Sequence, residues 1–395
     1  MKKLSVILGI AMIFFLAMNV FAGGSRTAAG GAPIKIGMYA DLSAGSAQWG
    51  NDCKKGGELI VKEVNARGGI LGRPLELIVY DSQQSPTEAV RSYTRLAQVD
   101  RVVAVNGSLV STTALAVQPV TDQLRIPVVS RALDERVTTP GFNPDDPDRA
   151  IPPANYFFLT QPSAFQHAGI IASYAIHELK MNSFAMLYSP GNAYSLYLAK
   201  GFEYYVRKNG KQMLGSFEFQ AGDQDFRPQL TRIRDLNPEG LFITEYVVAN
   251  ANAARQAREI GVRSRFLGNN SWYIPMNEVA GAAADGAYFP NNFAFDNPKY
   301  SSFIAAYRAE YGEDPGLHSF SGYEDVGLII DAIARAGSDD PQKITEALKN
   351  TKSFKGVVAD ITINPQTHRP DGIGMAILRF VGANIETVEY EYFAK

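Results

Sequence analysis

The chain has 395 residues, 46% hydrophobic and 20% charged, which is enough for two or three ordinary domains and lacks the polar bias of a disordered protein. Its formal net charge is −2, so there is no strongly basic surface to follow a phosphate backbone, and a nucleic-acid partner is not expected. The single cysteine, Cys53, excludes an intramolecular disulfide. The four histidines lack metal-ligand spacing, so no metal site is predicted.

The N-terminus has the pattern of an export signal. A basic pair, Lys2 and Lys3, precedes an apolar run over residues 4–20 that ends in small residues suited to signal peptidase. We predict a cleaved signal peptide at residues 1–22 and a flexible tether at residues 23–33; an uncleaved N-terminal anchor is the alternative. No cysteine follows the signal, so a lipid-modified N-terminus is not expected, and the predicted location is the periplasm.

From residue 34 onward, strand-like runs alternate with amphipathic helical stretches. In the first half, strands are expected at residues 34–39, 75–80, 102–105 and 126–129, with helices at 52–66, after Ser85 and from Thr112. In the second half, strands are expected at 183–188 and 241–246, with helices at 193–208, 249–260, 322–336 and 341–350. This alternation predicts an α/β fold with parallel sheets covered by helices on both faces, in two lobes with a cleft between them.

Two local features have a structural interpretation. Cys53 falls in phase with Gly57, Ile60 and Val64 on one helix face, which predicts a buried structural thiol. Residues 139–154 are rich in proline and aspartate but match no calcium-binding loop, and they are expected to form a solvated surface excursion.

The turn from Gly107 to Thr113 follows a strand and opens a helix. Free backbone N–H groups and the helix dipole favour an anion there. Its hydroxyls also suit helix capping, and we expect both roles, with Ser111 and Thr112 as the best ligand contacts. The sequence has no Gly-x-Ser-x-Gly elbow, no Ser/His/Asp constellation and no phosphate loop, so we predict no catalytic residue, no cofactor and no enzyme activity.

Several segments, taken together in their order and spacing, carry a family resemblance. They are residues 43–50, 65–77 and 106–116, Asp225 with Phe226, residues 255–261 and 303–307, and Tyr323. Through them the chain resembles the leucine/isoleucine/valine-type solute-binding proteins of ABC importers. The resemblance implies a two-lobed type I periplasmic binding fold, each lobe a parallel-sheet βαβ sandwich with helices on both faces.

The resemblance also implies three crossings between the lobes, near Gln161, Pro290 and Val358. Lobe 1 is then expected to comprise residues 34–160 plus 291–357, and lobe 2 residues 161–290 plus 358–395. The ligand-binding residues implied by the resemblance are Trp49, Ser111, Thr112, Arg131, Ala132, Tyr194, Tyr246 and Asn270.

The chain departs from the family pattern at Val110, where relatives often carry a serine, and at Leu133, where they carry a threonine. Arg131 is available to pair with an acidic ligand group, or equally with Asp134 or Glu135 at the rim. Each interpretation fits the sequence.

A third departure concerns the ligand's amine. Asn270 stands where relatives supply an acid for the ammonium. Glu245 is a possible substitute, but strand alternation is expected to point it away from the side of Tyr246. The ligand is therefore an amino acid or a related amine-free carboxylate or amide, and an aromatic ligand fits Trp49, Tyr194, Tyr246 and Trp272.

The function that follows is capture of such a solute by hinge closure and its delivery to an ABC importer permease. The alternative is a ligand-sensing module that presents the same ligand class to a membrane receptor. A monomer is expected.

Overall fold

The structure is a computed structural model. It describes residues 31–43, 45, 47–220, 222–273, 276–294, 296–382 and 384–395. The predicted signal peptide and most of the predicted tether lie outside these residues.

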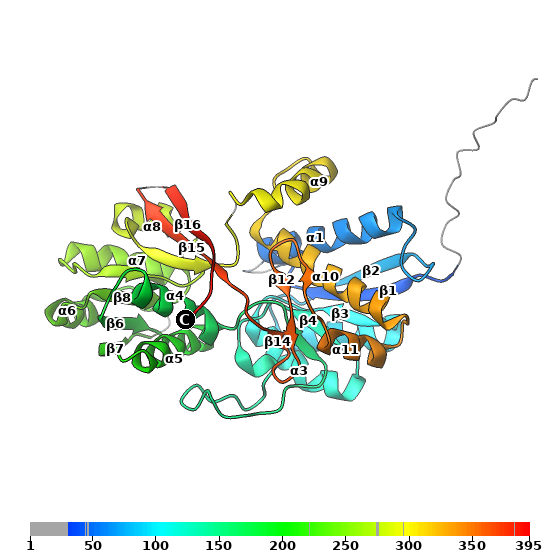
Figure 1. Cartoon of the computed structure of the whole chain (residues 1–395), viewed down its shortest axis with the longest axis horizontal. Helices are drawn as coiled ribbons and strands as arrows, with labels where there is room; N and C mark the ends of the chain where they lie inside the picture. Colours follow the sequence, from blue (N-terminus) through cyan, green and yellow to red (C-terminus); the bar gives the residue numbers. More distant parts are fainter. Residues whose placement is uncertain are drawn as a thin grey trace, which may run out of the picture.

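The first sheet has five parallel strands in the order β2-β1-β3-β4-β5. The strands are β1 (Ile34–Ala40), β2 (Leu75–Asp81), β3 (Ala104–Asn106), β4 (Val128–Ser130) and β5 (Phe157–Leu159). The helices on it are α1 (Ala47–Ala66), α2 (Pro86–Arg95) with its π-helical extension η1 (Leu96–Asp100), α3 (Ser111–Leu124), α10 (Leu317–Ala336) and α11 (Pro341–Lys349). Helices α1, α10 and α11 share an apolar core with one face of the sheet, and α2 and α3 share another with the opposite face (Figure 1). We call this assembly lobe 1.

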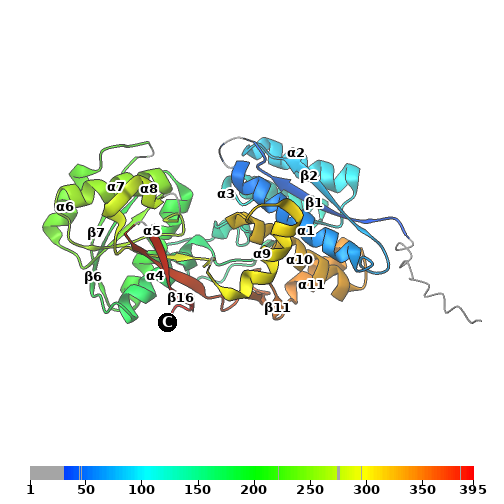
Figure 2. The same ribbon diagram turned by 90° about the horizontal axis from the view of Figure 1, so that it is seen from above.

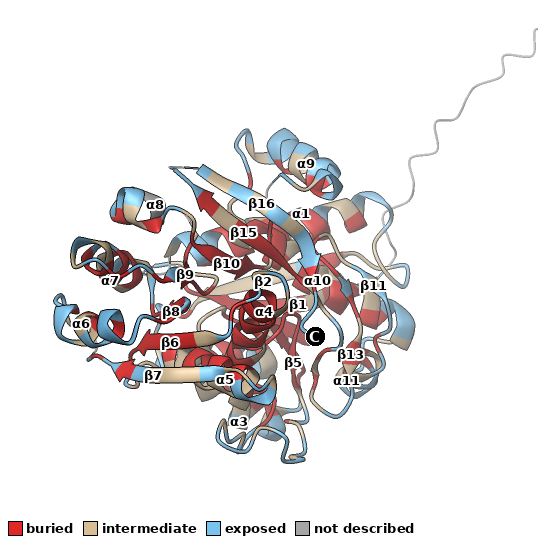
Figure 3. Ribbon diagram, turned by 60° about the vertical axis from the view of Figure 1, so that its left-hand side comes forward, coloured by how far each residue is buried: buried red, intermediate tan, exposed pale blue. Residues whose placement is uncertain are grey.

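The second sheet has the strand order β16-β15-β10-β9-β8-β6-β7, in which β10 to β7 run parallel and β15 and β16 are antiparallel. The strands are β6 (Ser183–Tyr188), β7 (Gln212–Glu218), β8 (Gly240–Thr244), β9 (Arg265–Leu267), β10 (Tyr288–Asn291), β15 (Met375–Val381) and β16 (Asn384–Tyr392). The helices on it are α4 (Ala164–His177), α5 (Ala193–Lys208), α6 (Arg227–Leu236), α7 (Val247–Glu259), α8 (Met276–Ala280) and the turn η3 (Gly281–Ala284). Helices α4 and α5 cover one face and α6 to α8 the other. Helix α4 is buried along nearly its whole length (Figure 3). We call this assembly lobe 2.

The chain passes between the lobes three times, at residues 160–163, at 292–294 with 296–297, and at 371–374. Figures 1 and 2 show the lobes side by side with these segments between them. After the second passage, η4 (Pro298–Tyr300) and α9 (Ser301–Tyr311) pack beside α1 and α10 in a smaller aromatic core.

The sequence predicts the third passage near Val358, but in the structure it lies further along the chain, at residues 371–374. Short strand pairs keep the chain on lobe 1 up to residue 370: β11 (Phe354–Lys355) with β12 (Asp360–Ile361), and β13 (Ile363–Asn364) with β14 (Arg369–Pro370). Ile361 and Ile363 belong to the lobe 1 core, and the ring of His368 stacks on Phe158 with centroids 4.4 Å apart. Residues 358–370 therefore pack with lobe 1, because their apolar side chains complete its core.

Helices α1 and α10 cross closely enough to require glycine. A Cβ added at Gly322 lies 1.8 Å from the carbonyl oxygen of Cys53, and one added at Gly56 lies 1.9 Å from that of Ser319. Cys53 itself is buried and within hydrogen-bond distance of the Asn106 side chain, 3.5 Å away, and burial raises the pKa of its thiol. The prediction of a buried structural thiol is confirmed.

Most of residues 139–154 are exposed, as expected for a surface excursion, but the segment also contacts lobe 2. The ring of Phe142 packs against Phe165 of α4 with centroids 5.6 Å apart, and Lys200 of α5 donates to Asp145 at 2.8 Å. An aromatic anchor and an ion pair thus hold this segment, which we call the strap, against the neighbouring lobe.

Candidate functional site

The candidate ligand residues follow strands of both sheets at their carboxyl ends, where ligands of α/β proteins bind. In lobe 1 they come after β3 and β4, and in lobe 2 after β6, β8 and β9. Three of these loops open helices, α3 in lobe 1 and α5 and α7 in lobe 2. The fold therefore places the predicted residues on one edge of each lobe.

The first turn of α3 has no side-chain cap. The N-cap residue is Val110, and Thr113 donates its hydroxyl back to the Val110 carbonyl at 2.7 Å. Ser111 Oγ accepts a hydrogen bond from the Leu133 N–H at 3.2 Å, and Thr112 is exposed. The expectation that these hydroxyls cap the helix is wrong, because a valine occupies the capping position. The amides of the first turn, which have no partner within a helix, remain available for an anion.

Trp49 and Ala132 have different environments. Trp49 lies in the first turn of α1, is 43% exposed and packs its ring against His318 with centroids 5.4 Å apart. Ala132 is fully buried, and its N–H donates to Ser130 Oγ at 3.0 Å. Trp49 is thus accessible to a ligand, whereas neither the methyl group nor the amide of Ala132 is.

In lobe 2 the structure brings three predicted residues together. The rings of Tyr194 and Tyr246 stack with centroids 5.4 Å apart and an interplanar angle of 10°. Tyr194 Oη donates to Asn270 Oδ1 at 2.5 Å, and burial raises the pKa of this phenol. Tyr246 is 50% exposed, so the stacked pair presents an aromatic surface beside an amide.

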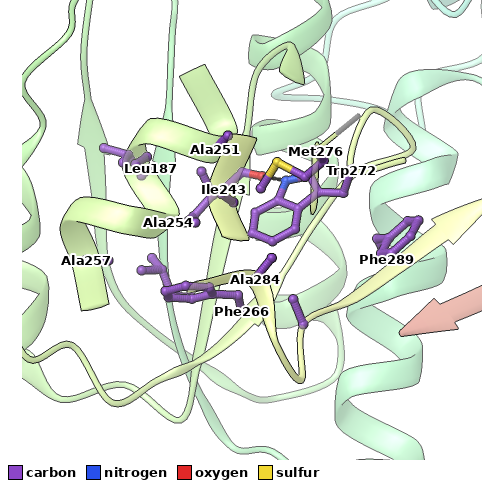
Figure 4. Close-up of a cluster of buried hydrophobic side chains, with 14 of the residues drawn as sticks. Leu187, Ile243, Ala251, Ala254, Ala257, Phe266, Trp272, Met276, Ala284 and Phe289 are labelled. Atoms are coloured by element: carbon purple, nitrogen blue, oxygen red, sulfur yellow. Dashed lines mark hydrogen bonds between the residues drawn. The ribbon is translucent and has the colours of Figure 1, made fainter. Parts of the chain in front are cut away.

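Trp272 does not join this group. It is fully buried in the lobe 2 core, near Phe266 and Met276 (Figure 4), and its indole N–H donates to the Ile243 carbonyl at 3.1 Å. The interpretation of Trp272 as a ligand-facing aromatic is therefore wrong, because it fills the core.

Strand alternation predicts that Glu245 points away from the side of Tyr246, but β8 ends at Thr244, so the alternation does not extend to Glu245. Its carboxylate is nearly buried and accepts hydrogen bonds from Asn192 Nδ2 at 2.6 and 2.8 Å. Asn192, the N-cap of α5, was missed. The signal that identifies it is an asparagine immediately before a predicted helix, two residues from Tyr194.

His167 of α4 was also missed as a neighbour of the site. It is fully buried, and neither ring nitrogen makes a hydrogen bond of normal geometry with the described residues. Burial lowers its pKa to about 3, partly opposed by the Asn270 side chain and the Pro162 carbonyl. The imidazole is therefore neutral at physiological pH.

Arg131 lies in an ion network instead of on an open surface. Its Nε is 3.1 Å from Asp325 Oδ1, its Nη2 contacts Glu324 Oε1, and all three side chains are buried. Neither Asp134 nor Glu135 is its partner, since Asp134 pairs with Arg136. The expectation that Arg131 pairs with Asp134 or Glu135 is wrong, because its guanidinium is bound by two buried carboxylates of α10. Its contact with a ligand stays a prediction.

This network adjoins a pocket of about 120 Å³ between the lobes. The pocket is lined by residues of all three crossing segments, including Gln161, Asn292 and Ile373, and by Arg131 and Glu324. Hydrogen bonds connect the first two segments there: Gln161 donates to the Arg131 carbonyl and accepts from Asn292. These two crossing segments are thus tied to the buried ion network.

Within the described part of the chain, no group of three or more His, Cys, Asp or Glu side chains is arranged to hold a metal ion. Among the same residues, no helix has the length and apolar character needed to cross a membrane.

A family model described as "Periplasmic binding protein" matches residues 33–383. Leu/Ile/Val-binding protein homolog 3 of Brucella melitensis is 28% identical over 337 residues, covering 84% of this chain and 87% of that protein. A leucine-, isoleucine-, valine-, threonine- and alanine-binding protein of Pseudomonas aeruginosa is 25% identical, covering 85% and 87%. The crystal structure of a leucine-binding protein from Thermotoga maritima aligns with a TM-score of 0.75 at 25% identity, covering 90% of this chain and 98% of that one. The match over nearly all described residues, together with the two-sheet architecture, shows that the chain belongs to the periplasmic binding protein family, whose members bind solutes and are not enzymes.

Proposed function

We propose that this protein captures a small carboxylate solute, an amino acid or a close relative, between its lobes and delivers it to an ABC importer permease. The observation that carries the proposal is the pairing of an uncapped α3 terminus on lobe 1 with the stacked Tyr194 and Tyr246 on lobe 2. The α3 amides supply an anion site, and the tyrosines supply an aromatic wall. Relatives named for binding leucine, isoleucine and valine support the amino-acid class.

Hinge closure about the three crossing segments is the proposed mechanism. Each lobe has its own cores on both faces of its sheet, so the lobes are suited to move as rigid bodies. Closure brings Ser111 and Thr112 toward Tyr194, Tyr246 and Asn270, and Trp49 then covers the ligand from lobe 1. Small-angle scattering should record a smaller radius of gyration when ligand is added.

The first experiment is a thermal-shift screen of protein purified after expression of the full chain. Amino acids, aromatic acids, short dicarboxylates and amides are tested in parallel. A ligand at a hundred times its Kd adds about 2.7 kcal/mol to the stability of the folded state, which is a visible shift. If no carboxylate produces a shift, the proposal is wrong.

A matched pair of variants tests the α3 site. Thr112→Glu puts an acid on the exposed second position of α3, where it interacts favourably with the helix dipole but repels a bound carboxylate. Thr87→Glu makes the same change at the second position of α2, which is also exposed. We expect both variants to fold normally and only Thr112→Glu to lose ligand affinity.

We also propose that residues 1–22 form the cleaved export signal and that the mature protein is a monomer. The basic start, the apolar run and the small residues at its end support the cleavage site. Intact mass and light scattering of the exported protein test both statements. A mass that includes residues 1–22, or a dimer, contradicts the corresponding one.

A further inference from the structure

Glu245 is an acid placed at the edge of lobe 2 with only neutral partners. Glu245 is 9% exposed, and both of its carboxylate oxygens accept hydrogen bonds from one amide nitrogen, Asn192 Nδ2. No Lys, Arg or His of the described residues forms an ion pair with it, and burial raises its pKa. A nearly buried carboxylate without a counter-charge is costly.

The orientation of this acid is fixed by its neighbours. Asn192 Oδ1 accepts the Tyr194 N–H at 3.0 Å as the N-cap of α5. The amide nitrogen of Asn192 must therefore point the other way, toward Glu245. Because Asn192 and Glu245 each lie within two residues of a stacked tyrosine, the carboxylate is held at the margin of the Tyr194–Tyr246 pair.

The side chain at the family's acidic position is already engaged. Asn270 Oδ1 accepts the Tyr194 hydroxyl, and the neutral His167 lies beside it. Asn270 thus positions Tyr194 and carries no charge with which to pair an ammonium.

We infer that Glu245 is the residue that pairs with the ligand's ammonium, and that the ligand is accordingly an α-amino acid instead of an amine-free carboxylate. This inference rests on the proposed function, in which the α3 terminus takes the carboxylate. The ligand's cation supplies the counter-charge that Glu245 lacks in the free protein. The adjacent faces of Tyr194 and Tyr246 add a favourable cation–π contribution.

The test uses pairs of ligands that differ only in the amine: leucine with 4-methylpentanoate, and phenylalanine with 3-phenylpropanoate. Each is titrated calorimetrically into the wild-type protein and into Glu245→Gln. The variant keeps the size of the side chain and an acceptor for Asn192 but removes the charge. Glu203→Gln on α5 makes the same charge change in an i,i+4 pair with Arg207 and is the matched control.

We expect the wild-type protein to bind the amino acid of a pair at least tenfold more tightly than its amine-free partner. Glu245→Gln should lose at least tenfold in affinity for the amino acid and less than threefold for the amine-free acid, and Glu203→Gln should change neither. The wild-type comparison alone decides the ligand class if the variant folds poorly.

Two results would overturn the inference while leaving the proposed function intact. One is equal or tighter binding of the amine-free acids by the wild-type protein. The other is an equal loss for both members of a pair in Glu245→Gln. If no acid of either kind binds, the proposed function and the inference fall together.

Discussion

Arg131 and Asp325 form an ion pair 3.1 Å long that is buried on both sides, between a loop of lobe 1 and helix α10. Asp325 also accepts hydrogen bonds from Thr160 at 2.7 Å and Asn106 at 3.3 Å. Glu324, the second partner of Arg131, accepts the Val358 N–H at 2.6 Å. The pair is thus the centre of a polar network that reaches the first crossing segment.

Replacing Arg131 by methionine should destabilise the protein strongly. Two buried carboxylates would lose their counter-charge, and breaking a buried pair in this way costs about 3–5 kcal/mol. Urea denaturation at pH 7 measures the loss. The deficit should shrink at pH 5, because protonation removes the uncompensated charges. Arg91→Met is the control, since its ion pair with Glu88 is largely exposed and is expected to contribute about 1 kcal/mol or less. Equal losses in the two variants would contradict the role assigned to Arg131.

His167 should make the protein less stable at mildly acidic pH. Its folded-state pKa is about 3, below the value of about 6.5 in an unfolded chain. As the pH falls below 6.5, the unfolded state takes up a proton that the folded state does not, so stability is lost. The loss for this residue is about 2 kcal/mol at pH 5. His167→Gln should therefore show a smaller difference in unfolding free energy between pH 7 and pH 5 than the wild type. Identical differences would show that His167 is charged or exposed in the folded protein.

The crossing of α1 and α10 can be tested with two glycines of the same helix. Gly322→Ala places a methyl group 1.8 Å from the Cys53 carbonyl and must push the helices apart. At Gly327 the nearest atom is 3.6 Å away, so alanine fits there and should gain up to about 1 kcal/mol in helix propensity. We expect melting temperatures to fall for Gly322→Ala and to hold or rise for Gly327→Ala. If both variants melt alike, the close crossing is not as described.

The strap should become sensitive to protease when its aromatic anchor is removed. Phe142→Ala deletes the contacts with Phe165 and Tyr197, which lowers the free energy of local opening. Limited proteolysis with mass spectrometry should show faster cleavage within residues 139–154. Asp146→Asn, at an exposed position of the same segment, is the control and should be cleaved at the wild-type rate. Unchanged cleavage of Phe142→Ala would contradict the anchoring role.

The regular elements followed closely from local sequence patterns. The strand at residues 183–188 and the helix at residues 193–208 have the predicted ends, because a short apolar and aromatic run and a helix with its own N-cap are local signals. The contacts of the strap with lobe 2 and the position of the third crossing could not be predicted from local sequence patterns. Phe142 and Ile361 find their partners in distant segments, and a proline-rich composition does not reveal such contacts.

The sequence predicted which aromatic and amide side chains come together at the site, but it did not predict the partners of the charged side chains. Tyr194, Tyr246 and Asn270 come together at the edge of lobe 2. The role of Arg131 was missed because its partners, Glu324 and Asp325, are almost 200 residues away in sequence. The orientation of Glu245 was missed because the alternation rule depends on where a strand ends, which the sequence defines only to within a few residues.

The interleaving of the lobes also governs when the protein can fold. The core around α1 is incomplete without α10, which begins at Leu317, and the second sheet lacks its last two strands until residue 392. In a chain made from its N-terminus, the face of α1 that packs on α10 therefore lacks this partner until residue 317 and beyond have been added. Both lobes are completed only by segments from the C-terminal part of the chain, α10 in the first and β15 with β16 in the second.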